Sequence, residues 1–161
     1  VDAMLAWAER NELPVRGHNI YWGKSWTEKY GVPKWQKQLN DKDLLRAVKE
    51  RATSIAKRYK GRFAEYDFNN EMMYGNFYED RLGRGVTKQM ADWVVKEDPE
   101  AILYLNDFGV HNLPPYRYSD DLHSWCRSRG LPALDQEIDF PGHAPDAVTD
   151  VLHQITAVFT L

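Results

Sequence analysis

The sequence lacks several features that define other classes of protein. It has a single cysteine, Cys126, in 161 residues, so it can form neither an internal disulfide nor a cysteine-based zinc site. No apolar run approaches the roughly 20 residues that a membrane-spanning helix requires. Lys plus Arg (21) nearly balances Asp plus Glu (24), for a net charge of −3. This balance gives no reason to expect nucleic acid or an anionic membrane as a partner.

Metal and phosphate motifs are also missing. No two of the histidines lie four residues apart on one predicted helix, and none sits in a carboxylate cluster with metal-ligand spacing. Gly83 and Gly85 lack the rest of either glycine-rich phosphate-binding pattern. The sequence therefore predicts no metal and no cofactor.

The composition is that of one globular domain. Apolar residues make up 43% of the chain and charged residues 28%, which argues against disorder. Aromatic residues reach 13%, with six tryptophans and nine tyrosines. Most aromatic rings pack in cores, but flat rings also stack on the apolar faces of sugars. Richness in aromatics does not decide between these two roles.

Predicted strands alternate with predicted helices along the chain. The strands are expected over residues 13–18, 63–68, 101–105 and, more weakly, within 134–140. The helices are expected over 2–12, 40–59, 87–96, 119–129 and from about 145 through 152–161. Such alternation is typical of parallel strands joined by helical crossovers.

Polar residues cluster where the predicted strands end. His18 follows the first strand, Asn70 and Glu71 follow the second, and Asn106 and Asp107 follow the third. The carboxyl ends of the strands in a (β/α)8 barrel converge on the face that carries the active site. Each residue alone is more typical of a turn or a solvated loop, but their convergence favours a site. A glutamate there suits general acid–base chemistry, as glycoside hydrolysis requires.

Three segments in register resemble motifs of glycoside hydrolase family 10, the endo-β-1,4-xylanase family. Residues 14–22 (PVRGHNIYW), 66–72 (YDFNNEM) and 103–108 (LYLNDF) resemble the family's third, fourth and fifth strand segments. The resemblance implies a partial TIM (β/α)8 barrel of about four parallel strands alternating with helices, covering strands three to six. Residues 1–161 would then be a fragment of a single catalytic barrel.

The resemblance assigns roles to residues at these strand ends. Glu71 corresponds to the catalytic acid/base, and Asn70 to the asparagine that binds the sugar 2-hydroxyl. His18 and Trp22 correspond to residues that line the subsite for the glycone sugar. The implied activity is hydrolysis of β-1,4-xylan or a related plant polysaccharide with retention of configuration.

The later strands match less well. By resemblance, Asn106 and Asp107 are the polar pair beside the catalytic centre. The family's sixth-strand histidine corresponds either to His143, which we prefer, or to a position changed within residues 137–139. The seventh-strand segment with the nucleophilic glutamate (Thr-Glu-x-Asp type) does not occur in the sequence. The chain alone is therefore expected to be inactive.

Other interpretations stay open on the sequence. The chain could be a fragment, a truncated reading frame or a product of frame errors. A non-catalytic carbohydrate-binding relative could use Trp22, Trp26 and Trp35 to stack sugars, and a different retaining hydrolase would share the Asn-Glu pair. A polysaccharide substrate implies a secreted or periplasmic location, by resemblance only. The sequence does not define endo or exo action or the oligomeric state.

Overall fold

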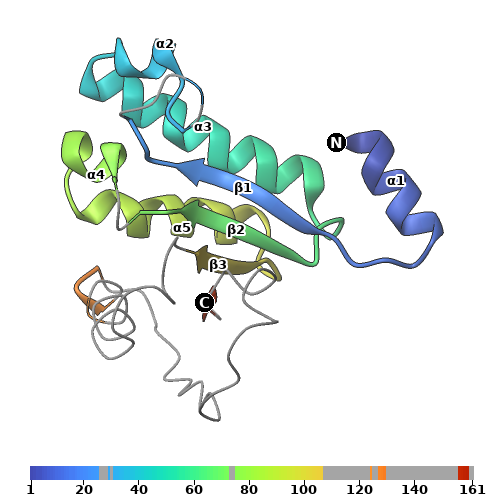
Figure 1. Ribbon diagram of the computed structural model, residues 1–161. Coiled ribbons are helices and arrows are strands. Elements are labelled where there is room, and N and C mark those ends of the chain that lie inside the picture. Colours follow the sequence, from blue (N-terminus) through green and yellow to red (C-terminus); the bar gives the residue numbers. More distant parts are fainter. Residues whose placement is uncertain are drawn as a thin grey trace, which may run out of the picture.

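The computed structural model describes residues 1–25, 29, 31–72, 75–106, 124, 127–129 and 156–159. Within these ranges, helices cover a four-stranded sheet of order β1-β2-β3-β4 (Figure 1). The strands are β1 (Arg16–Trp22), β2 (Glu65–Asn70), β3 (Ile102–Asn106) and β4 (Thr156–Phe159). The helices are α1 (Asp2–Arg10), α2 (Lys34–Lys37), α3 (Asp41–Tyr59), α4 (Phe77–Leu82) and α5 (Gly85–Glu97).

The first three strands are parallel neighbours, as predicted. His18 of β1 pairs with Asp67 of β2, and Asp67 pairs in turn with Tyr104 of β3. Helix α3 connects β1 to β2, and helices α4 and α5 connect β2 to β3. Because each connection between parallel strands passes through helix, the chain forms an open section of a (β/α)8 barrel.

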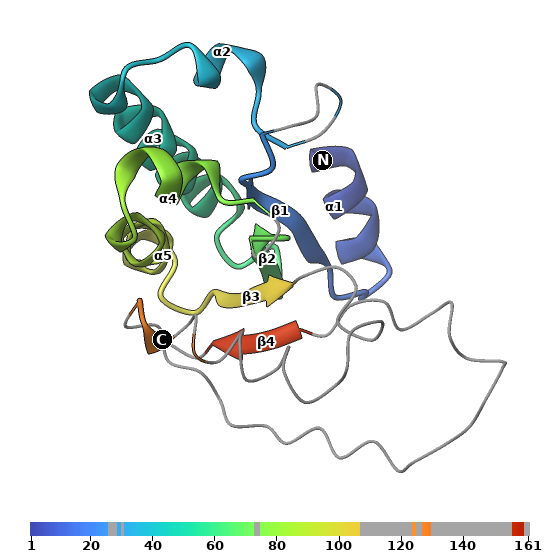
Figure 2. The same cartoon turned by 60° about the vertical axis from the view of Figure 1, so that its left-hand side comes forward.

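The direction of the fourth strand differs from the prediction. Strand β4 runs antiparallel to β3, with Leu103 opposite Phe159 and Asn106 opposite Thr156 (Figure 2). The sequence analysis expected helix over these last residues. The segment Thr-Ala-Val-Phe is instead rich in β-branched and aromatic residues, which favour strands. It satisfies the backbone groups that the free edge of β3 presents. The strand expected within 134–140 lies outside the described residues.

Helix α3 follows the predicted pattern closely. Asn40 caps its first turn, because the Asn40 Oδ1 accepts a hydrogen bond from the Asp43 backbone N–H at 2.9 Å. The buried side chains recur every four residues, at Leu44, Val48, Ala52 and Ala56. This spacing places them on one helix face, which packs against the sheet as part of the core.

The core lies between the sheet and helices α3, α4 and α5. It contains side chains from all three parallel strands, such as Tyr21, Phe68 and Leu105. Gly17 faces this side, since a Cβ there would lie 3.2 Å from the Tyr66 ring. Alternation along a strand therefore directs its neighbours Arg16 and His18 to the opposite face. That face is the one that lines the inside of a barrel.

Two short helices were not predicted. α2 and α4 both lie in segments that glycine and proline marked as loops. Neither helix contains enough turns to show an apolar period, so periodicity could not identify them. Among the residues that the structure describes, no helix is long and apolar enough to cross a bilayer.

Buried tyrosines predict a loss of stability in alkali. Tyr78 is buried, and its hydroxyl donates a hydrogen bond to Gln36 Oε1 at 3.1 Å. Burial raises the pKa of Tyr78 to about 12 and that of Tyr66 to about 12. In the unfolded chain a tyrosine titrates near 10. Between pH 10 and 12 the unfolded state therefore loses protons that the folded state keeps, and the free energy of unfolding falls.

Urea unfolding between pH 8 and pH 12 measures this effect. Below pH 10, these tyrosines should leave the free energy of unfolding unchanged. It should then fall by up to about 1.4 kcal/mol per pH unit for each buried tyrosine. A Tyr78→Phe variant should show a shallower fall over the same range. An identical pH profile in Tyr78→Phe would contradict the assignment to Tyr78.

Candidate active site

The predicted site residues gather at the carboxyl ends of the parallel strands. Trp22 ends β1 and pairs with Asn70, which ends β2. Asn70 also pairs with Asn106, which ends β3. Glu71 follows Asn70 directly. Three consecutive strands therefore bring these residues to the same end of the parallel sheet. His18, which was predicted to follow the first strand, lies instead within β1, because β1 extends to Trp22.

The carboxylate of Glu71 is held from β1 and from the loop that follows it. Its Oε2 accepts a hydrogen bond from Trp22 Nε1 at 3.1 Å and from Lys24 Nζ at 3.3 Å. The Glu71 side chain is only 19% exposed. Among the described residues, nothing donates a hydrogen bond to the other oxygen, Oε1. The carboxylate is thus positioned by one oxygen and open to a ligand at the other.

The backbone at Glu71 is unusual. Its φ angle is 52°, in the left-handed region that non-glycine residues rarely adopt. Such a conformation costs about 1–3 kcal/mol and persists only where the surroundings hold it. Here the contacts to Trp22 and Lys24 hold the side chain, so the strand turns sharply at its end and directs the carboxylate back over β1. Residues in this conformation cluster at functional sites.

Lys24 was missed by the sequence analysis, although it stands two residues beyond the predicted Trp22. The loop after β1 closes tightly around it: the Val32 backbone N–H donates to the Lys24 carbonyl at 2.9 Å. Gly31 permits this approach, because its φ is +85° and a Cβ there would lie 2.1 Å from the Lys24 carbonyl oxygen. The lysine in a lysine-rich loop directly after a strand was the available signal.

His18 is oriented by a buried carboxylate. Asp67 has a side chain only 4% exposed, and its Oδ2 lies 2.8 Å from His18 Nδ1. Its Oδ1 accepts from Arg16 Nε at 2.7 Å. With Nδ1–H donated to Asp67, a neutral His18 has Nε2 as an acceptor, and the side-chain amide nitrogen of Asn19 lies 3.3 Å from it. Asp67 was also missed, because its position opposite His18 depends on the register of β1 and β2.

The sheet face opposite the core, which carries Arg16 and His18, also has polar side chains on β3. The Arg16 guanidinium carbon lies 4.0 Å from the centre of the Tyr104 ring, and the Tyr104 hydroxyl donates to Glu65 Oε1 at 2.9 Å. The His18 and Trp22 rings meet edge to face, with centroids 6.5 Å apart. A continuous polar and aromatic surface therefore leads from the middle of the strands to Glu71.

Other predicted residues are not placed beside Glu71. Asp107, His143 and Trp26 lie outside the described residues. Asn106 is placed by its backbone pairing alone. Trp35 lies on α2 and is 55% exposed. Within the described part of the chain, no group of three or more His, Cys, Asp or Glu residues could hold a metal ion.

A section of parallel β/α barrel with a shielded carboxylate at its strand ends defines the class of (β/α)8 barrel proteins with a site at the carboxyl face. Residues 1–133 match the model of glycosyl hydrolase family 10, and the chain belongs to that family. The resemblance that the three strand motifs indicated is thereby confirmed, together with the fold class.

Comparisons with individual proteins give the same family and the same fold. The chain is 45% identical over 111 residues to Endo-1,4-beta-xylanase 3 of Arabidopsis thaliana, covering 69% of this chain and 14% of that protein. It is 32% identical over 151 residues to anti-sigma-I factor RsgI6 of Acetivibrio thermocellus, covering 91% and 18%. Xylanase XynB from Paenibacillus barcinonensis, 21% identical, superposes with a TM-score of 0.67 over 81% of this chain and 42% of that one.

The chain is much shorter than these proteins. It spans 14%, 11% and 14% of the length of three Arabidopsis xylanases. The solved structure supports the fold, in which the described strands and helices form one section of a complete barrel.

Proposed function

We propose that a protein carrying this chain hydrolyses the glycosidic bonds of β-1,4-xylan or a related plant polysaccharide, with Glu71 as the acid/base of a retaining mechanism. The observation that carries the proposal is the placement of Glu71. Its carboxylate lies at the carboxyl ends of the parallel strands, largely shielded, with Oε2 bound by Trp22 and Lys24 and Oε1 open to a ligand. Family membership supports the reaction class.

In the proposed first step, Glu71 transfers its proton to the glycosidic oxygen as the bond to the anomeric carbon breaks. A second carboxylate attacks that carbon from the opposite face and forms a covalent glycosyl-enzyme. In the second step, Glu71 takes a proton from water, whose oxygen displaces the second carboxylate. A retaining pair of carboxyl groups lies about 5–5.5 Å apart. We propose that the second carboxylate belongs to the seventh strand of a closed barrel.

The neighbouring residues suit sugar binding. Asn70, at the end of β2, is proposed to hold the 2-hydroxyl. His18 and Trp22, whose rings meet edge to face, are proposed to line the glycone subsite. For Asn106, Asp107 and His143, sugar contacts remain proposals by position in the family motifs. Because xylan is an extracellular polymer, we also propose a secreted or periplasmic location.

The reaction and its stereochemistry can be tested together. The full-length protein should release xylooligosaccharides from xylan. Proton NMR in the first minutes should show the product with the β configuration at its new reducing end, since two displacements retain it. Initial appearance of the α product would contradict the retaining mechanism. If the protein does not hydrolyse xylan but hydrolyses another β-linked glycan, the proposed substrate is wrong.

A carbohydrate-binding function without cleavage is the second candidate. The Glu71 carboxylate, held by Lys24 through Oε2, can accept hydrogen bonds from sugar hydroxyls through Oε1 without transferring a proton. The similarity to a protein named as an anti-sigma-I factor is in keeping with a role other than hydrolysis. Calorimetry with xylohexaose, followed by chromatography of the same sample, separates the two: heat of binding without shortened products would favour this candidate.

A further inference from the structure

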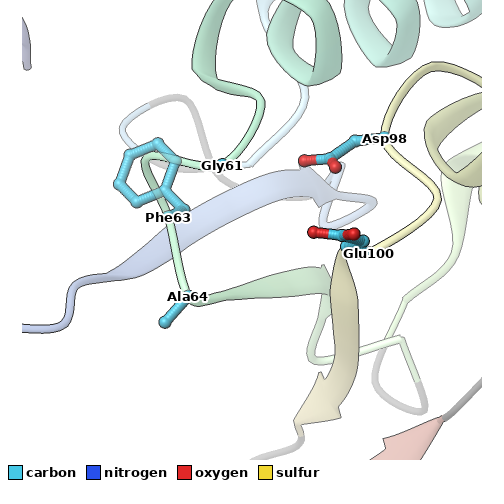
Figure 3. A pocket seen from close by; sticks show the side chains of 5 residues that line it. All are labelled: Gly61, Phe63, Ala64, Asp98 and Glu100. Carbon is cyan, nitrogen blue, oxygen red and sulfur yellow. The ribbon is translucent and has the colours of Figure 1, made fainter.

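A pocket lies at the opposite end of the parallel strands from Glu71. Its lining residues are Gly61, Phe63, Ala64, Asp98 and Glu100 (Figure 3). These residues belong to the turns that lead into β2 and β3. The pocket is open to solvent and has a volume of about 210 Å³. Figure 3 shows the carboxylates of Asp98 and Glu100 on the same side of it, both directed toward the turn that carries Gly61 and Phe63.

Asp98 is the unusual member of this pair. It is only 2% exposed, and among the described residues no side chain or backbone group donates a hydrogen bond or an ion pair to its carboxylate. Its backbone is fully engaged, with the N–H donated to Val94 and the carbonyl accepting from Ala101. The backbone therefore fixes a buried carboxylate in place. Its oxygens reach solvent only through the pocket, and a largely buried carboxylate without a protein partner favours a cationic ligand there.

The surroundings of the pocket reinforce its negative potential. Helix α3 ends at Tyr59 and helix α5 ends at Glu97, so both helices bring their negative dipole ends to this region. Burial, and next the charge of Asp98, raises the pKa of Tyr66 to about 12. Of the nearby lysines, Lys57 pairs with Glu97 at 3.6 Å, and Lys60 is exposed.

We propose that this pocket binds a hydrated calcium ion through the carboxylates of Asp98 and Glu100. Calcium accepts oxygen ligands in flexible geometry and keeps waters where protein ligands are few. At about 30 Å³ per water, the pocket has room for the ion with several waters. Two carboxylates suit a weak site, with a dissociation constant of about 10⁻⁴–10⁻³ M. The site is separate from Glu71 and does not depend on the proposed hydrolysis.

Calorimetric titration of the chelator-treated protein with calcium chloride tests the proposal. One saturable site in the stated range is expected, and the Tm should rise with calcium concentration, because calcium binds the folded state. Asp98→Asn and Glu100→Gln should each weaken binding at least about tenfold, since each removes half of the ligand charge. Asp92→Asn is the matched control: it removes an exposed acid that pairs with Lys88 on the same helix.

The Tm values of Asp98→Asn and of the unaltered protein, compared with and without calcium, distinguish a cation site from a merely buried acid. Without calcium, Asp98→Asn should have a higher Tm than the unaltered protein, because it removes an uncompensated charge. With 10 mM calcium chloride the order should reverse. No saturable binding below 10 mM, or binding unchanged in Asp98→Asn, would overturn the proposal. If that variant does not fold, unchanged binding in Glu100→Gln, an exposed position, overturns it equally.

Discussion

Replacing Glu71 with glutamine is expected to lower kcat/KM on xylan by about 10²- to 10⁴-fold, the usual contribution of a general acid–base group. The side-chain amide keeps the size of the carboxyl group and an oxygen that can accept from Trp22 Nε1. It cannot supply a proton to the departing sugar oxygen. The initial rates of reducing-sugar release by the full-length protein and its Glu71→Gln variant measure the loss.

A substrate whose leaving group needs no protonation distinguishes the loss of the proton donor from the loss of the fold. In an aryl xyloside with an acidic phenol, the phenolate leaves without being protonated. With this substrate, Glu71→Gln should therefore form the glycosyl-enzyme nearly as fast as the unaltered protein. Glu50→Gln is the control, because Glu50 is exposed on α3 and far from the site. Xylan hydrolysis within tenfold of normal in Glu71→Gln would remove Glu71 from its assigned role.

Replacing Glu79 with alanine is expected to lower the free energy of unfolding by about 3–5 kcal/mol. Glu79 on α4 and Arg129 form a two-pronged ion pair: Arg129 Nε lies 2.6 Å from Oε1 and Nη2 lies 2.5 Å from Oε2. Both side chains are 7% exposed. The hydroxyl of Thr87 also donates to Oε1. Removing the carboxylate deletes both prongs of this ion pair from a largely buried guanidinium, and urea unfolding measures the cost.

A double variant tests the reason for that cost. Glu79→Leu with Arg129→Met replaces the pair with apolar groups, and it should recover much of the stability that either single change loses. The control is Lys88→Ala, which breaks an exposed pair with Asp92 on α5 and should cost under about 1 kcal/mol. A Glu79→Ala variant that loses less than this control would show that the buried pair does not hold α4 to the rest of the chain.

The elements that the sequence predicted well are those with a complete pattern of their own. Helix α3 has an asparagine cap and a regular apolar face from Leu44 to Ala56, and its predicted and observed bounds agree within a residue. Strand β1 was placed at 13–18 but spans Arg16–Trp22. Its second half, Ile20 and Tyr21, is buried, yet aromatic and lysine residues beyond it made the segment look like a loop.

The residues of the candidate site also fall into two groups, those that the sequence proposed and those that it missed. Glu71, Asn70, Trp22 and His18 were proposed because they match the family's strand motifs, although only Glu71 follows its strand in the structure. Lys24 and Asp67 were not, because their roles depend on pairing with residues 47 and 49 positions away. Apart from the lysine-rich loop that holds Lys24, nothing local to either residue indicates that contact. It arises from the parallel register of β1 and β2 and from the closed loop at Gly31.

The sequence by itself determined the class of fold, the family and the position of the candidate acid/base, because periodicity and strand-end motifs are local along the chain. Only the tertiary structure decided which groups touch Glu71, how His18 is oriented, and that the last strand runs antiparallel to β3. The physical reason is that hydrogen bonds and ion pairs between elements depend on register and backbone angles. These are settled only when the whole sheet and its helices pack together.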